Sequence, residues 1–259
     1  LYLKYEADKT IPKKTVPAQD LFFDLLKERA ETGRIYIMNL DHCNSHSSFK
    51  DKVSMSNLCQ EITLPTTPIQ DIHDEQGEIA LCILSAVNVG GLNDLGELEN
   101  ICDLAVRALE QIIDYQDYPV KAAEISTKNR RSLGIGYIGL AHYLAKNGVK
   151  YSDPKAWDLV DRLSEAFQYN LLRASCNIAM EKGKCEGFER TKYADGLLPI
   201  DHYKKDVDKI VPHKQRMAWE SLRKDIAKHG LRHSTLSAQM PSESSSVVSN
   251  ETNLSLIHI

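Results

Sequence analysis

Several features that mark common protein classes are missing from this 259-residue sequence. It has no apolar run long enough for a membrane span and no signal peptide at its start, so we expect a cytoplasmic protein. A net charge of −4 gives no basic footprint for nucleic acid. A repeat of fixed period, a low-complexity linker and the Gly-Lys-Ser/Thr motif of nucleoside triphosphatases are also missing. Neither a nucleic acid nor a membrane is therefore an expected partner.

The six cysteines include no Cys-x-x-Cys pair and no Cys/His arrangement with zinc-finger spacing, so no metal site is predicted. A disulfide scaffold is not expected in a chain this long without a secretion signal. Cys102 and Cys176 lie in helical patterns, which indicates buried structural thiols. Cys59 and Cys82 remain as the candidates for chemistry.

Hydrophobic periodicity divides the chain into helices and a few short strands. Helical patterns, caps and glycine stops predict helices over 20–32, 95–115, 120–146, 153–182 and 214–229. Alternation or apolar runs predict strands over 34–40, 79–87 and 231–239, with a polar loop over 41–48. Because strands alternate with helices, the predicted fold class is α/β, in one domain over 1–253.

The two ends of the sequence are unusual. The chain begins with Leu1, and residues 254–259 resemble a translated adapter sequence of the kind left in sequencing libraries. We therefore expect those six residues to be a non-native tail, with a short terminal strand as the alternative. We also expect the rest to be an internal piece of a longer protein.

The most informative segment carries Asn57, Cys59 and Glu61 at alternate positions. Two prolines follow soon after and oppose a helix, so we predict an extended backbone that points the three side chains to one side. A carboxylate can take a proton from a bound hydroxyl that an amide orients, and it disfavours a nearby thiolate anion. The trio therefore fits a thiol that exchanges a hydrogen atom better than an attacking thiolate. A buried, inert cysteine remains the alternative.

Cys82 lies within the apolar run 79–87 and has two possible roles. It is either a core thiol or one half of a redox dithiol whose partner is elsewhere.

A serine-rich motif follows the last predicted strand. Ser242, Glu243, Ser244 and Ser245 come directly after Met240-Pro241. If a helix begins here, its free N–H groups and the hydroxyls would favour a phosphate or diphosphate. A solvated serine loop is the alternative.

Residues 134–139 match the glycine pattern of dinucleotide-binding proteins. That fingerprint needs a preceding buried strand, whereas residues 126–131 are polar. We therefore interpret the glycines as sites of close packing between a helix and a neighbour.

Four motifs occur in a fixed order: Met55–Ile62, Leu81-Cys82, Arg131–Gly139 and Met240–Ser246. Together they resemble the catalytic large (α) subunit of class I ribonucleoside-diphosphate reductase, nearest to the bacterial class Ia type, over residues 1–253. The resemblance implies a ten-stranded α/β barrel with a finger loop through its centre. This helix-rich chain would form part of it.

The resemblance also implies roles for the candidate residues. Cys59 would stand at the tip of the finger loop, become a thiyl radical and remove the 3′ hydrogen of the ribose. Glu61 would be the base at the 3′ hydroxyl, and Asn57 would hydrogen-bond in the same site. Cys82 would be one of two thiols that end as a disulfide, its partner lying outside the chain. Residues 242–245 would bind the substrate diphosphate.

The implied partners are a ribonucleoside diphosphate, a small (β) radical-generating subunit, a second large subunit, and thioredoxin or glutaredoxin as reductant. No cofactor would bind within this chain, because the metal that generates the radical belongs to the β subunit. ATP and deoxynucleotide effectors would bind outside it, and the chain alone is expected to be inactive. A nucleotide-binding regulatory or scaffold protein and an NAD-linked dehydrogenase are the alternatives.

Overall fold

The computed structural model describes residues 2–211 and 214–253, so the predicted tail over 254–259 lies outside the described residues. The chain divides into two compact units, residues 1–38 and 39–259. The single domain predicted over 1–253 stays a prediction.

The first unit contains two helices, α1 (Tyr2–Ala7) and α2 (Ala18–Thr32). Gly33 adopts a φ of 64° and donates its N–H to the Arg29 carbonyl, which confirms the predicted helix and its glycine stop. No described residue of this unit is buried. The strand predicted over 34–40 is wrong. It has β-forming residues, but no described segment pairs with its backbone, and pairing is what completes a strand.

The second unit is built around two parallel strands, β1 (Ile83–Asn88) and β2 (Leu133–Ile138). Their register pairs Ile83 with Leu133 and ends with Asn88 opposite Ile138. The predicted strand over 79–87 is therefore confirmed from Ile83 onward. Every residue of β2 is buried, as expected for a strand covered on both faces.

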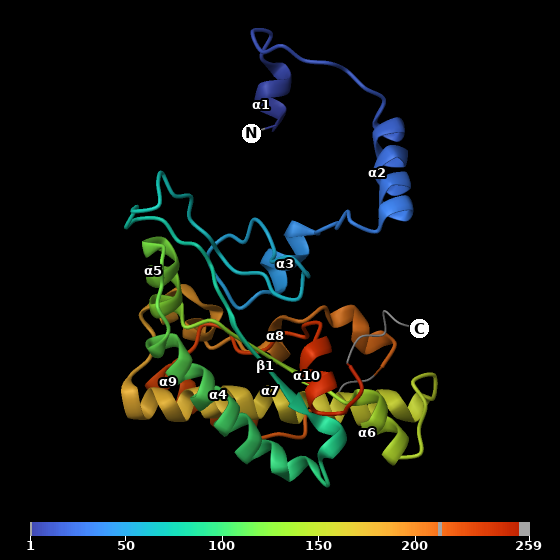
Figure 1. The fold of residues 1–259 in the computed structure, drawn as a ribbon, viewed down its shortest axis with the longest axis vertical. Helices are drawn as coiled ribbons and strands as arrows, with labels where there is room; N and C mark the ends of the chain where they lie inside the picture. Colours follow the sequence, from blue (N-terminus) through green and yellow to red (C-terminus); the bar gives the residue numbers. More distant parts are fainter. Residues whose placement is uncertain (1, 212–213, 254–259) are drawn as a thin grey trace. The chain divides into compact units, whose positions relative to one another are not determined.

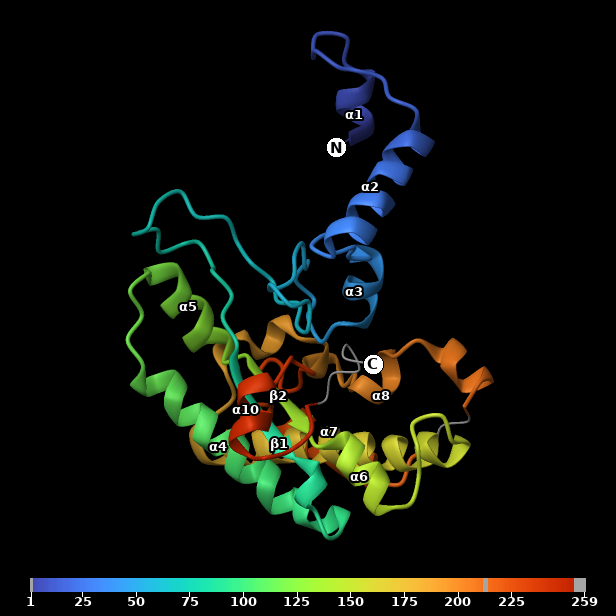
Figure 2. The same ribbon diagram turned by 45° about the vertical axis from the view of Figure 1, so that its right-hand side comes forward.

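Helices pack around these strands and enclose the core. Helix α4 (Leu98–Tyr115) packs against β1 and against α7 (Pro154–Lys182), which passes across the strands in Figures 1 and 2. Helix α9 (Trp219–His229) packs on α7. The predictions over 95–115 and 153–182 are confirmed, and that over 214–229 holds from Trp219.

The helix predicted over 120–146 is wrong in its middle. Helix α5 (Lys121–Arg130) ends before β2, and α6 (Leu140–Lys146) begins after it. The glycines therefore pack from a strand rather than a helix. A Cβ at Gly136 would lie 2.5 Å from the Ala238 carbonyl oxygen, so the strand accepts only glycine there without a shift.

The polar segment 41–48, predicted as a loop, instead contains α3 (Leu40–His46). The short elements that complete the second unit are η1 (Val89–Gly91), η2 (Leu95–Glu97), η3 (Glu186–Arg190), η4 (Lys192–Asp195), α8 (Pro199–His202) and η5 (Lys205–Lys209).

The strand predicted over 231–239 is reduced to a short extended stretch beside β2. Leu133 donates to the Thr235 carbonyl at 3.1 Å, and Ile135 donates to the Leu236 carbonyl at 2.8 Å. Only one isolated bridge, between Ile135 and Ser237, meets the pairing pattern of a strand. The chain then enters α10 (Glu243–Val248), so a helix does follow the proline. None of the helices in the described ranges is long and apolar enough to cross a bilayer.

Candidate active site

The candidate residues near Cys59 lie on a long segment between α3 and β1. Residues 47–82 contain only isolated bridges and turns, and Figure 1 draws them as a trace that leads into β1. Asn57 to Gln60 form a tight turn, in which Gln60 donates its N–H to the Asn57 carbonyl at 3.2 Å. We call residues 57–60 the cysteine turn. The predicted catalytic residues Cys59 and Glu61 therefore lie at and just after a turn of this segment.

The extended backbone predicted for Asn57, Cys59 and Glu61 is wrong. Gln60 adopts a φ of 58°, and Asn57 and Ile62 close the turn by exchanging hydrogen bonds. Proline excludes a helix downstream, but the spacing alone could not show that the chain reverses here. Cys59 is exposed in the middle of the turn, whereas Asn57 and Glu61 are half-buried.

Glu61 lines a cavity of about 230 Å³. Its Oε2 atom is buried and has no hydrogen-bond partner. The wall is mostly polar: His46, Ser47, Ser48, Thr63, Gln168, Tyr193, His202, Thr235 and Ser237, with Phe49, Ile62 and Pro199. His202 Nε2 is likewise buried without a partner. A buried carboxylate oxygen without a donor is available to accept a proton or a hydrogen bond from a bound molecule.

Cys82 lies just before β1 and is a half-buried free thiol. Burial raises the pKa of Cys82, and the negative charge of Glu61 raises it further. Cys82 also lines a cavity of about 260 Å³ together with Asn57 and Ile62. The structure therefore brings Asn57, Glu61 and Cys82 into one neighbourhood, although Glu61 and Cys82 face different cavities.

Ile62 lies two residues after the cysteine turn and packs near the sheet. Its side chain is buried, and its Cδ1 atom lies 3.8 Å from the position that a Cβ would take at Gly134. The missing side chain of Gly134 thus leaves room for Leu84, Ala238 and Ile62 to approach β2. The turn is placed against β1 and β2 by apolar packing.

The serine motif lies at the start of α10, beyond the extended stretch beside β2. Ser242 is buried, and its hydroxyl donates to the Met240 carbonyl at 3.2 Å. Glu243, Ser244 and Ser245 are exposed. None of these four residues lines the cavities at Glu61 or Cys82. Two exposed hydroxyls are therefore available for an anion.

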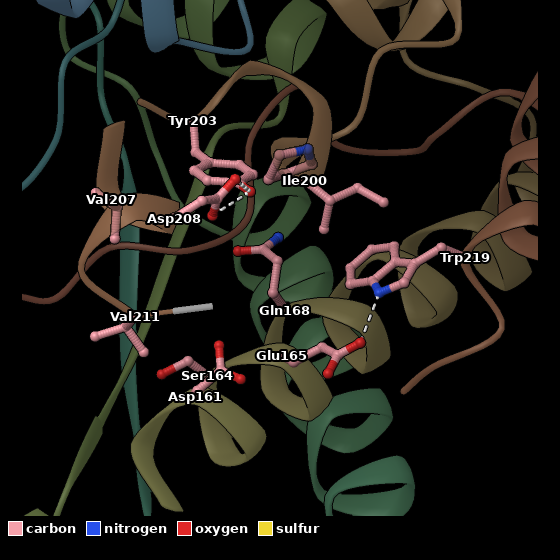
Figure 3. A pocket seen from close by; sticks show the side chains of 11 residues that line it. Asp161, Ser164, Glu165, Gln168, Ile200, Tyr203, Val207, Asp208, Val211 and Trp219 are labelled. Atoms are coloured by element: carbon pink, nitrogen blue, oxygen red, sulfur yellow. Dashed lines mark hydrogen bonds between the residues drawn. The ribbon is translucent and has the colours of Figure 1, made fainter. Parts of the chain in front are cut away.

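Another cavity of about 280 Å³ was not predicted from the sequence (Figure 3). It lies among α7, α8, η5 and α9 and contains none of the predicted site residues. Its carboxylates are already engaged. Glu165 accepts from Trp219 Nε1 at 2.9 Å, and Asp208 accepts from the Tyr203 hydroxyl. Asp161 likewise accepts from Arg216 at 2.6 Å, so all three carboxylates of this cavity already have partners within the protein.

Three other cysteines behave as structural thiols. Burial raises the pKa of Cys102 to about 12, of Cys176 to about 11 and of Cys185 to about 12. The predicted burial of Cys102 and Cys176 is confirmed. Among the described residues, no group of His, Cys, Asp and Glu side chains could hold a metal ion.

A buried polar cluster around Glu110 was not predicted from the sequence. Glu110 accepts from Arg131 at 2.7 Å, from Arg232 at 2.8 Å and from His233 at 3.0 Å. These residues are far apart in the chain, so no local motif signals the cluster. It ties α4 to the residues just before β2 and to those just before the extended stretch that lies beside β2.

Comparison with known proteins gives a consistent family. The family profile described as ribonucleotide reductase, barrel domain, matches residues 1–255. The chain is 60% identical to the ribonucleoside-diphosphate reductase subunit alpha of Haemophilus influenzae and 55% identical to the ribonucleoside-diphosphate reductase 1 subunit alpha of Escherichia coli. Each alignment covers 98% of this chain and 34% of the relative. The corresponding protein of phage T4 is 43% identical, with 33% of its length covered. The chain thus spans about a third of the length of these curated relatives.

Proposed function

Because the chain belongs to the ribonucleotide reductase family and matches its barrel domain, we propose that it contributes the active site of an α subunit. That subunit reduces ribonucleoside diphosphates to 2′-deoxyribonucleoside diphosphates. The observation that carries the proposal is the arrangement at the cysteine turn. Cys59 is exposed in the turn, and Glu61, whose Oε2 atom has no hydrogen-bond partner, follows two residues later. The charge of the same carboxylate raises the pKa of Cys82.

In this proposal Cys59 receives a radical and acts as a thiyl. It takes the hydrogen atom from C3′ of the ribose, and Glu61 accepts the proton of the 3′ hydroxyl. The 2′ hydroxyl then takes a proton from one of two thiols, Cys82 and a second cysteine, and leaves as water. The two thiols supply two electrons and the second hydrogen, which C2′ gains, and they become a disulfide. Cys59 finally returns its hydrogen atom to C3′ and regains its radical. A raised pKa suits Cys82 to this task, because a protonated thiol still has the hydrogen that it must give up, whereas a thiolate has already lost it.

Residues 242–245 are proposed to hold the diphosphate of the substrate. The exposed hydroxyls of Ser244 and Ser245 can donate to phosphate oxygens, while Ser242 is already bonded to the chain. Glu243 lies between them as the first residue of α10, and because its carboxylate would repel a phosphate, its backbone N–H is the group proposed to bind there. Asn57 is proposed to hydrogen-bond to the substrate beside Cys59.

The relatives are named as alpha or large subunits, which supports a partner subunit for this chain as well. We propose a β subunit whose metal cofactor generates the radical, a second α subunit as dimer partner, and thioredoxin or glutaredoxin as reductant. ATP and deoxynucleotides would act as effectors outside these residues. The proposed location is the cytoplasm.

The proposal is tested in a complete α subunit that contains these residues, assembled with its β subunit. Cys59→Ser should bind a ribonucleoside diphosphate with unchanged affinity and show no turnover. Cys43→Ser, a half-buried cysteine of α3 with no proposed role, is the matched control and should keep its activity. Retained turnover in Cys59→Ser would show that this thiol does not carry the radical, and an assembled parent protein that binds nucleotides without any turnover would favour a nucleotide-binding regulatory or scaffold protein instead.

A further inference from the structure

Two arginines and two carboxylates form a closed cluster at the start and end of the segment that carries the cysteine turn. Arg130 contacts Asp51 at 2.9 Å and Glu78 at 2.6 Å. Arg190 contacts the same two residues, each at 2.8 Å. Each guanidinium therefore bridges both carboxylates, and each carboxylate meets both guanidinium groups. The two positive and two negative charges balance within the cluster.

The cluster joins two points that are distant in sequence. Asp51 precedes the cysteine turn, and Glu78 follows it after residues 61–77. Thr67 and Glu78 also exchange backbone hydrogen bonds of 3.0 Å, so the returning part of the segment is tied to Glu78. Fixing Asp51 and Glu78 thus fixes the base of the loop from which the turn projects.

The arginines come from the ends of two helical elements of the second unit. Arg130 is the last residue of α5, three positions before β2, and its side chain is 1% exposed. It also lies over the ring of the buried Phe49, 5.9 Å from the ring centroid. Arg190 ends η3, and its carbonyl accepts the N–H of Lys50. The cluster therefore connects Asp51 and Glu78, at the base of the loop, to the ends of α5 and η3.

We propose that Arg130 and Arg190 are positioning residues for the cysteine turn. They hold both ends of the loop that contains it and so set where Cys59 and Glu61 stand relative to the sheet. Arg130 donates to Glu78 through Nε and Nη2, and Arg190 donates to it through Nη1, so Glu78 is fixed in direction as well as distance. Asp51 is held by the charges of the same two arginines, at 2.9 and 2.8 Å. The inference rests on the proposed function, since it assigns these arginines to the same reaction.

The test uses Arg190, whose side chain is 45% exposed, because its removal disturbs the core less than removal of Arg130. In the assembled α and β subunits, Arg190→Met should lower kcat by about 10- to 100-fold, since small misplacements of reacting groups are costly. Binding of the diphosphate substrate should stay within about twofold, because α10 does not contact the cluster. Arg190→Lys keeps the charge but lacks the planar fork that contacts both carboxylates at once in a fixed geometry, so it should recover part of the rate.

Arg107 provides a matched control. It also bridges two carboxylates, Asp103 and Glu181, and its side chain is 37% exposed, but it joins α4 to α7 instead of the loop. Arg107→Met should keep kcat within about twofold. Hydrogen exchange should rise in peptides covering 52–77 for Arg190→Met and remain unchanged there for Arg107→Met.

Two results would overturn the inference: an unchanged kcat in Arg190→Met, or an equal loss of kcat in Arg107→Met. If Arg190→Met does not fold, Asp51→Asn weakens the same cluster from the loop side and should show the same pattern. If the parent enzyme shows no reductase activity, the proposed function fails. Hydrogen exchange of peptides covering 52–77 in the parent, Arg190→Met and Arg107→Met then still decides whether the cluster holds the loop.

Discussion

The negative charge of Glu61 disfavours ionisation of the Cys82 thiol. Burial raises the pKa of Cys82, and the Glu61 charge adds to that effect across the gap between the turn and β1. The two residues are 21 positions apart, and the loop brings them together by turning back on the sheet. This coupling links the proposed base to the proposed reductant.

The first prediction concerns that coupling. Glu61→Gln removes the negative charge, so the pKa of Cys82 should fall, although burial keeps it above the ordinary value. At a fixed pH the thiolate fraction and the rate of alkylation by iodoacetamide should rise. The measurement is the labelling rate of Cys82 between pH 7 and 10, read by mass spectrometry. The rate at Cys185, buried elsewhere, should not change. An unchanged rate at Cys82 would contradict the coupling.

The second prediction concerns the glycines of β2. Gly136→Ala should destabilise the sheet by about 1–3 kcal/mol, because its Cβ would lie 2.5 Å from the Ala238 carbonyl oxygen and 3.0 Å from Met240 Sδ. The measurement is hydrogen exchange of the β2 amides. Gly91→Ala is the control, since the nearest atom there is 3.8 Å away. The packing interpretation also predicts no nicotinamide binding, and saturable binding of NAD that Gly136→Ala abolishes would refute it.

The third prediction concerns acid stability. Burial acts to raise the pKa of Glu110, but hydrogen bonds from His233, Arg131 and Arg232 outweigh it and hold the pKa at about 2. Since this pKa is below its usual 4.5, the stabilisation is complete above pH 4.5 and is lost as the pH falls toward 2. The loss should be about 3 kcal/mol, from about 1.4 kcal/mol for each pKa unit.

Burial lowers the pKa of His233, so protonation of the unfolded chain below its usual 6.5 adds to the acid loss. Glu110→Gln should be less stable at pH 7, because Arg232 loses its carboxylate partner and Arg131 keeps only Asp114. Its stability should depend less on pH between 5 and 2. Hydrogen exchange of α4 amides at several pH values measures both effects. Glu186→Gln, at an exposed carboxylate, should follow the parent curve. A Glu110→Gln curve as steep as the parent's would show that this carboxyl does not drive the loss.

The fourth prediction concerns the substrate phosphates. Replacing Ser244 and Ser245 together by alanine should weaken binding of a nucleoside diphosphate by about 10-fold or more, because two donors to an anion are lost. Binding of the corresponding nucleoside, which has no phosphate, should change little. Equilibrium dialysis of both ligands gives the comparison. Ser249→Ala, at the end of α10, is the control. Equal losses for both ligands would contradict a phosphate role.

The apolar periodicity of the sequence predicted the long helices, because each of them repeats its buried residues at helical spacing. The helices over 95–115 and 153–182 have strong apolar periodicity, and each agrees with the structure at its main boundaries. Strand β2 was missed because its glycines break any regular pattern. It forms because β1 on one side and residues 235–238 on the other supply hydrogen bonds to its backbone.

The sequence by itself determined the family and the chemical groups present at the site, because residue types and their order are local properties of the chain. It placed a thiol, an amide and a carboxylate within five positions, and a second thiol on the segment that follows. Only the tertiary structure decided that the first thiol lies on a turn and that Glu61 influences Cys82. It also decided that Arg190 meets Glu78, 112 positions earlier. Such contacts depend on the path of the folded backbone, because packing and charge pairing act between residues that the sequence keeps apart.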